Sequence, residues 1–145
     1  MRDYRKILVC LDLTEESEKI AGRAKALAAT FGAELTLLHV VEYVPVEPMG
    51  EALLPAVQIE GELAERARVR IAELSARLGL GGCEQLVQTG NIKTEVVRIA
   101  QTRAIDLIVI GSRERHGVSI LFNFTEDTVL HAAPCDVLAV RLHKE

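Results

Sequence analysis

The chain alternates short apolar runs with longer segments in which apolar residues recur every three or four positions. The first run, 6–11, is apolar without alternation, as in a parallel strand covered on both faces. Similar runs predict four further strands. The one around 83–89 is expected to be the weakest, because polar residues flank Leu86 and Val87. The other three lie at 34–41, 106–110 and 136–142.

Four segments with helical periodicity separate these strands. The expected helices cover about 15–31, 59–78, 93–103 and 119–133. Thr14 is suited to cap the start of the first helix and Gly32 to end it, whereas Pro134 stops the last one. The apolar stripe that defines the second helix consists of Ile59, Leu63, Ala67, Ile71, Leu74 and Leu78.

This alternation of strands and helices predicts an α/β fold. Crossovers between parallel strands are right-handed, so the element order gives an open, doubly wound parallel sheet with helices on both faces. The 145 residues contain no linker and no internal repeat. We therefore expect a single domain over 1–145.

The stretch 42–58 fits neither a strand nor a helix. It carries Pro45, Pro48 and Pro55 and has little periodicity. A connection of this length usually has a role of its own. Three roles stay open: a cover over the neighbouring helices, a lid over a ligand, or part of a subunit contact.

Composition and charge narrow the function classes. A net charge of −4, with basic residues spread along the chain, argues against nucleic-acid binding, which needs clustered Lys and Arg. No apolar run reaches the roughly 18 residues of a membrane span, and no secretory signal is recognisable, so we expect a cytoplasmic protein without membrane contact. The widely spaced cysteines match no metal motif, which favours reduced structural thiols at Cys10, Cys83 and Cys135.

Ligands of open α/β sheets bind beyond the carboxyl ends of the strands, where the strand order reverses. Here that crevice is expected between the ends of the first and fourth strands, beside Asp12 and the segment 111–117. This segment is expected to be a turn between a strand and a helix, and Gly111 and Gly117 bound it. Its amides are therefore placed to approach an anion, although it matches neither common phosphate-binding motif.

The sequence carries no recognisable catalytic motif. It has no G-x-S-x-G nucleophile elbow and no metal-type cysteine and histidine spacing. His39 lies within an expected strand and is interpreted as a hydrogen-bonded structural residue. We therefore expect no enzyme, with weak ATP hydrolysis left open.

Several segments resemble the universal stress protein family. They are KILVCLDLTEES at 6–17, LTLLHVV at 35–41, DLIVIGS at 106–112 and HAAPCDVLAV at 131–140. The resemblance runs along essentially the whole chain in the right order. It implies a Rossmann-like fold of the adenine nucleotide alpha-hydrolase type with strand order 3-2-1-4-5, a homodimer, and a role in bacterial stress tolerance.

The family divides into members that bind ATP and A-type members that do not. Binders carry glycine, two residues, glycine, nine residues, and then glycine followed by Ser or Thr. By resemblance, Asp12 and Val40 would border the adenosine, and Gly111 with the loop after it would hold the phosphates.

This sequence departs from that signature after Gly111. The second glycine position is Glu114, and the third is Phe124, followed by Thr125, or Asn123 when the count runs back from the end of the last helix. A Glu114 carboxylate about 4 Å from a triphosphate would cost about 4 kcal/mol at an effective dielectric constant near 20.

Charges near the crevice leave two functions open. Acidic residues cluster at the start of the first helix, where their negative charge repels phosphate. Basic side chains in the expected loop after the fourth strand would attract phosphate instead. The favoured function is a non-catalytic, homodimeric stress-response or interaction protein of the A-type that needs no cofactor. The alternative is a nucleotide-gated signalling module that binds ATP or AMP. The acidic residues are Asp12, Glu15 and Glu16, and the basic ones are Arg113, Arg115 and His116.

The fifth strand is expected at an edge of the sheet, where its apolar run has little protection beyond Arg141. An unguarded apolar edge strand invites pairing. We expect an isologous homodimer in which the two edges meet antiparallel across a two-fold axis. The pairing residues would be Val137, Leu138, Ala139 and Val140.

Overall fold

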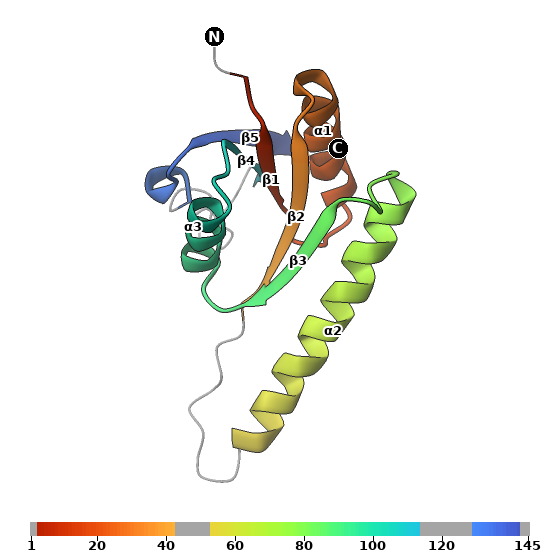
Figure 1. Ribbon diagram of the computed structural model, residues 1–145. Coiled ribbons are helices and arrows are strands. Elements are labelled where there is room, and N and C mark those ends of the chain that lie inside the picture. The colour runs from red at the N-terminus through yellow and green to blue at the C-terminus, as the bar shows by residue number, and fades with distance from the viewer. Residues whose placement is uncertain (1–2, 43–52, 114–128, 143–145) are drawn as a thin grey trace.

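A computed structural model of the chain describes residues 3–42, 53–113 and 129–142. Five parallel strands form one sheet in the order β3-β2-β1-β4-β5, which confirms the order that the family resemblance implied (Figure 1). The strands are β1 (Lys6–Cys10), β2 (Glu34–Val41), β3 (Glu84–Thr89), β4 (Leu107–Arg113) and β5 (Asp136–Leu142). The helices with described bounds are α1 (Ser17–Phe31), α2 (Leu53–Arg77) and α3 (Ile92–Thr102).

Helices cover both faces of the sheet, as predicted (Figure 1). α1 and α2 pack on one face against Ile7 and Val9, and α3 packs on the other face against Leu8. Since successive residues of a strand point to opposite faces, β1 supplies both clusters. These three side chains have no exposed surface, which explains why β1 is apolar without alternation.

The boundaries of α1 are partly as expected. Gly32 ends the helix in the left-handed conformation, with φ of +64°, and its N–H donates to the Ala28 carbonyl. The predicted cap at Thr14 is wrong, because the helix begins at Ser17 after Glu16. Thr14 belongs to the turn before the helix, where its carbonyl accepts the Ser17 N–H at 3.1 Å.

The helix α2 begins at Leu53, so the expectation that 42–58 forms no element is wrong for 53–58. Pro55 is the reason why no helix was predicted there. It is the third residue of the helix, and N–H groups in the first turn have no partner inside a helix, so proline costs little there. The predicted residues 43–52 of this stretch lie outside the described part of the chain.

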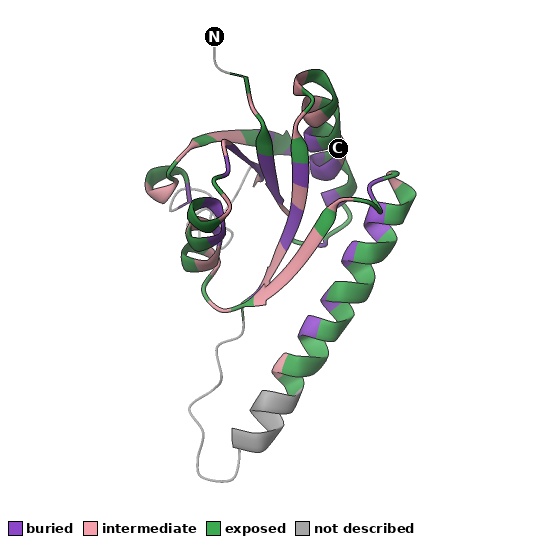
Figure 2. Ribbon diagram, in the orientation of Figure 1, coloured by how far each residue is buried: buried purple, intermediate pink, exposed green. Residues whose placement is uncertain are grey.

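The buried side of α2 differs from the stripe predicted from the sequence. Ala67, Ile71 and Leu74 are buried as expected, but Ile59 is 45% exposed and Leu63 is 37% exposed. Figure 2 shows the buried residues of α2 in purple on the side that faces the sheet. The buried side instead continues through Ala64. The first half of the predicted stripe therefore does not belong to the core.

The strand β4 is longer than predicted and includes Gly111, Ser112 and Arg113. These residues pair with Val140, Arg141 and Leu142 of β5. The expected turn at 111–117 therefore does not begin at Gly111. Of the predicted helix at 119–133, only 129–133 lies within the described residues, and its first four residues are helical.

Candidate functional site

The edge at which the crevice is predicted consists of the carboxyl ends of β1 and β4, where the strand order reverses. Val9 aligns with Leu37 of β2 and Val109 of β4, and the strands run parallel. The same register brings Asp12, Val40 and Gly111 to this edge, two or three residues further along the strands. The remaining predicted site residues, Glu114, Asn123 and Thr125, lie outside the described residues, as do Arg115, His116 and Phe124.

The carboxylate of Asp12 is engaged within its own loop. Its Oδ1 accepts hydrogen bonds from the Thr14 N–H at 3.1 Å, the Thr14 hydroxyl at 2.8 Å and the Ser17 hydroxyl at 2.9 Å. Ser17 is the first residue of α1, so the carboxylate lies at the start of that helix. A negative charge is favourable there because the helix dipole is positive at its N-terminus.

Two distant side chains fix the rest of the loop between β1 and α1. The Nδ1 of His39 lies 2.7 Å from the Leu11 carbonyl oxygen, and because a carbonyl only accepts, Nδ1 carries the proton. This hydrogen bond confirms the structural role predicted for His39. Arg70 of α2 donates to the Leu13 carbonyl. Leu13 itself has a φ of +59°, a strained conformation for a leucine that these contacts hold in place.

Arg70 was not predicted, because the sequence shows it only as one charge among many on a helix face. Its acceptor lies 57 residues away in the chain. No local spacing points to such a contact.

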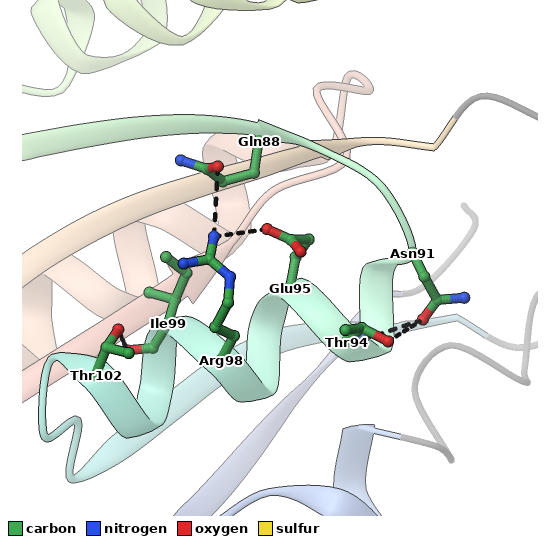
Figure 3. A network of polar contacts seen from close by, with 7 residues as sticks. All are labelled: Gln88, Asn91, Thr94, Glu95, Arg98, Ile99 and Thr102. Carbon is green, nitrogen blue, oxygen red and sulfur yellow. Dashed lines mark hydrogen bonds and ion pairs between the residues drawn. The ribbon is translucent and has the colours of Figure 1, made fainter.

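The start of α3 lies at the same edge of the sheet and is also capped by the chain itself. Asn91 is the N-cap, and its side-chain oxygen accepts the Thr94 N–H at 3.0 Å and the Thr94 hydroxyl at 3.2 Å (Figure 3). The Ile92 N–H donates to the carboxylate of Glu42, which follows β2, at 3.1 Å. The starts of α1 and α3 at this edge therefore each already hold a carboxylate of the protein.

A polar network joins α3 to the edge strand β3 (Figure 3). Arg98 donates to Glu95 at 2.7 Å, one turn earlier in α3, and to the Gln88 side chain of β3 at 3.4 Å. The hydrogen bond and charge of Glu95 raise the pKa of Arg98. Arg103 pairs with Glu84 at the other end of β3. These contacts hold the helix beneath the strand and leave their charges paired.

Packing explains why residue 111 is glycine. A Cβ at this position would lie 2.6 Å from Cδ1 of Ile20 and 2.9 Å from Cδ1 of Leu142. Ile20 belongs to α1 and is 2% exposed, so it has little room to move. A side chain at residue 111 would force Ile20 and Leu142 to shift, so packing favours glycine here independently of any ligand.

The thiol closest to the crevice is Cys10, the last residue of β1. Burial, followed by the effect of Cys135, raises the pKa of Cys10 to about 12. A thiol with so high a pKa is a poor nucleophile at neutral pH. All three cysteines are free and half-buried, which agrees with a structural role.

The described residues offer little evidence for a metal site, a serine nucleophile or a membrane-spanning helix. Among residues 3–42, 53–113 and 129–142, no group of three or more His, Cys, Asp or Glu side chains is arranged to hold a metal ion. Ser75 donates to the Ile71 carbonyl, which is not a base. Ser17 donates to a carboxylate oxygen of Asp12 that already accepts two hydrogen bonds from Thr14, which fits a capping contact better than an activated nucleophile. In the same part of the chain, no helix is both long and apolar enough to cross a membrane.

Comparisons with known proteins agree in pointing to one family. The sequence profile of the universal stress protein family matches residues 3–141. Universal stress protein A homolog 2 of Coxiella burnetii is 37% identical over 143 residues, which cover 98% of each chain. UspA from Lactobacillus plantarum has a similar structure, with a TM-score of 0.77 at 23% identity over 97% of this chain and 100% of that one. A universal stress protein solved in complex with cAMP gives a TM-score of 0.65 at 20% identity, with coverage of 96% and 98%.

Proposed function

Because this chain belongs to the universal stress protein family, we propose that it is a non-catalytic, homodimeric stress-response protein of the A-type. It acts by contacting other proteins and does not retain ATP. The observation that carries this proposal is the carboxylate bound at the starts of two helices, Asp12 at α1 and Glu42 at α3.

A triphosphate needs free amides and positive potential, and helix N-termini usually supply both. Here the Ile92 N–H is bonded to Glu42, and the Thr14 N–H is bonded to Asp12. A phosphate would have to displace these carboxylates or lie beside them, and hydrogen bonds to charged groups are worth roughly 1.5–3 kcal/mol each. A carboxylate at Glu114, which follows β4 in the sequence, adds to the expected repulsion.

Calorimetric titration of the purified chain with Mg-ATP tests this directly. The proposal expects a dissociation constant above about 1 mM, which is a binding free energy of less than about 4 kcal/mol. No saturable heat should therefore appear at nucleotide concentrations up to about 1 mM. A one-to-one isotherm with micromolar affinity would contradict it.

The homodimer is proposed to form through β5, the edge strand next to β4. Val137 and Leu138 are half-buried and Ala139 is exposed, so part of this apolar strand remains accessible. The opposite edge, β3, carries the Glu84–Arg103 ion pair, and charge of this kind discourages strand pairing. In a two-fold dimer through β5, each chain contributes its β5 edge to the contact and leaves its β3 edge unpaired.

A second candidate is a nucleotide-gated signalling module. The similar protein that was solved with cAMP favours it, because cAMP carries less charge than ATP and avoids part of the repulsion. Val40 is half-buried at the crevice and offers an apolar contact for a base. Saturable binding of AMP or cAMP that is lost in Val40→Arg, measured by the same calorimetry, would favour this alternative.

A further inference from the structure

One side of α2 carries exposed residues at regular spacing. Starting at residue 59, they follow at intervals of four and three, so they lie along one side of the helix. We call this row the α2 flank. It consists of Ile59, Leu63, Arg66, Arg70, Glu73 and Arg77.

The α2 flank is separate from the side of the helix that packs on the sheet. Ile59 and Leu63 are 45% and 37% exposed, and its charged members are exposed as well (Figure 2). Arg70 reaches the Leu13 carbonyl, so the flank lies toward the loop that precedes α1. Its first residues are apolar, and the rest carry three arginines against one glutamate.

The arginines of the flank lack carboxylate partners within the part of the chain that the structure describes. The ion pair of α2 found there joins Arg68 to Glu65, and neither residue belongs to the flank. Arg66 and Arg70 stand four residues apart, a spacing at which like charges destabilise a helix. A partner with negative charges would remove this repulsion.

We propose that the α2 flank binds an amphipathic helix of a partner protein, one that has apolar side chains at one end and acidic side chains at the other. The alternation of four and three keeps the flank on one side of α2, the side along which a second helix would lie. From Ile59 to Arg77 the flank extends about 27 Å, the length of a helix of about 18 residues. The inference rests on the proposed function, in which the protein acts by contacting other proteins. It names the surface that makes this contact and the class of partner that binds there.

A protein helix fits these residues better than a membrane or a nucleic acid. The apolar part consists of two side chains, too few for stable insertion into a lipid surface. The chain has a net charge of −4, which opposes binding to an extended polyanion. A short acidic helix places its charges against the arginines alone.

The test is fluorescence anisotropy of the full-length protein with two labelled helical peptides of about 18 residues. One peptide carries two leucines at one end and glutamates at the positions facing the arginines; the other has lysines in place of those glutamates. We expect saturable binding of the glutamate peptide and at least tenfold weaker binding of the lysine peptide. The double variant Arg66→Glu/Arg77→Glu is expected to lose about tenfold in affinity for the glutamate peptide and to bind the lysine peptide better.

Arg68→Glu is the matched control, because it changes the same residue type on another side of the same helix. It should alter the affinity less than twofold. Ile59→Ser and Leu63→Ser should weaken binding while thermal unfolding remains unchanged, since both side chains are exposed. The proposal is overturned if neither peptide binds, if Arg68→Glu weakens binding as much as the double variant does, or if the protein sediments with anionic vesicles and not with the peptide. Nucleotide binding and dimer formation are measured separately, so a failure of the proposed function is distinguishable from a failure at the flank.

Discussion

Gly111 is a single residue for which two explanations compete, a bare backbone for phosphate or a close approach of α1. The structure places Ile20 and Leu142 where a Cβ would lie. We predict that Gly111→Ala lowers the free energy of unfolding by about 1–3 kcal/mol, as overpacking of a core does. Adding Ile20→Val should recover part of this loss, because it removes the methyl group that a Cβ would contact.

Urea denaturation of the two single variants and the double variant measures this coupling. If Gly111→Ala leaves the stability unchanged, the packing explanation is wrong and the ligand explanation gains ground.

Cys10 gives the fold a dependence on alkaline pH. Burial raises its pKa from 9.0 to about 12, so the folded chain holds the thiol proton more tightly than the unfolded chain does. This stabilisation is complete below pH 9 and is lost as the pH rises towards 12. Between pH 8 and pH 10.5 the loss should be up to about 2 kcal/mol.

Cys10→Val removes the ionisable group and keeps an apolar side chain. Its free energy of unfolding should therefore fall less between pH 8 and pH 10.5 than that of the wild type. Equal slopes for the two proteins would show that the thiol does not titrate as its environment implies.

At the scale of secondary-structure elements, two glycines of α1 differ in what they contribute. Gly22 lies within the helix, and a Cβ there would meet nothing within 4 Å, whereas Gly32 ends the helix with a φ of +64°. We predict that Gly22→Ala stabilises the fold by about 0.5–1 kcal/mol, because alanine loses less backbone entropy in a helix. Gly32→Ala should destabilise it by about 1 kcal/mol, since a left-handed conformation is costly with a Cβ. Thermal unfolding of both variants is the measurement, and shifts of the same sign would contradict the assignment.

Periodicity in the sequence predicted the elements well where both faces of an element are packed. The apolar runs placed β1 and β2 within one residue of their observed bounds, because strands buried by the rest of the fold carry a continuous signal. The same reasoning failed for α2. Pro55 suggested a loop, but it lies in the first turn of the helix, where proline is tolerated. Ile59 and Leu63 are apolar and were expected in the core, but both side chains are exposed.

Of the candidate site, the sequence predicted the residues that end or follow a strand, such as Asp12, Val40 and Gly111, because a parallel register brings strand ends to one edge. Asp12 and its turn follow directly from β1. Glu42 and Arg70 were missed because their hydrogen-bond partners lie 50 and 57 residues away in the chain. Only the folded sheet brings these residues together.

At the scale of the whole molecule, the two edges of the sheet predict how copies assemble. Ala139 is exposed on β5, whereas Val140 is 4% exposed and Leu138 packs against the core, so lysine at either of the latter two would disturb folding as well as pairing. We predict that Ala139→Lys yields monomers, because a charge would face its own copy across the two-fold axis. Thr89→Lys, on the exposed end of β3, is the matched control and should remain dimeric.

Sedimentation velocity separates these outcomes. Dimers of Ala139→Lys, or monomers of Thr89→Lys, would place the contact elsewhere on the molecule.

The central claim is that the crevice edge is already occupied by the protein's own carboxylates and does not retain ATP. The most direct measurement is chromatography of the small molecules released when the chain, purified without added nucleotide, is denatured. The account predicts less than about one molecule of adenine nucleotide per ten chains, as expected when weak binding is lost during purification. One ATP per chain would contradict it and would make this protein a nucleotide-binding member of its family.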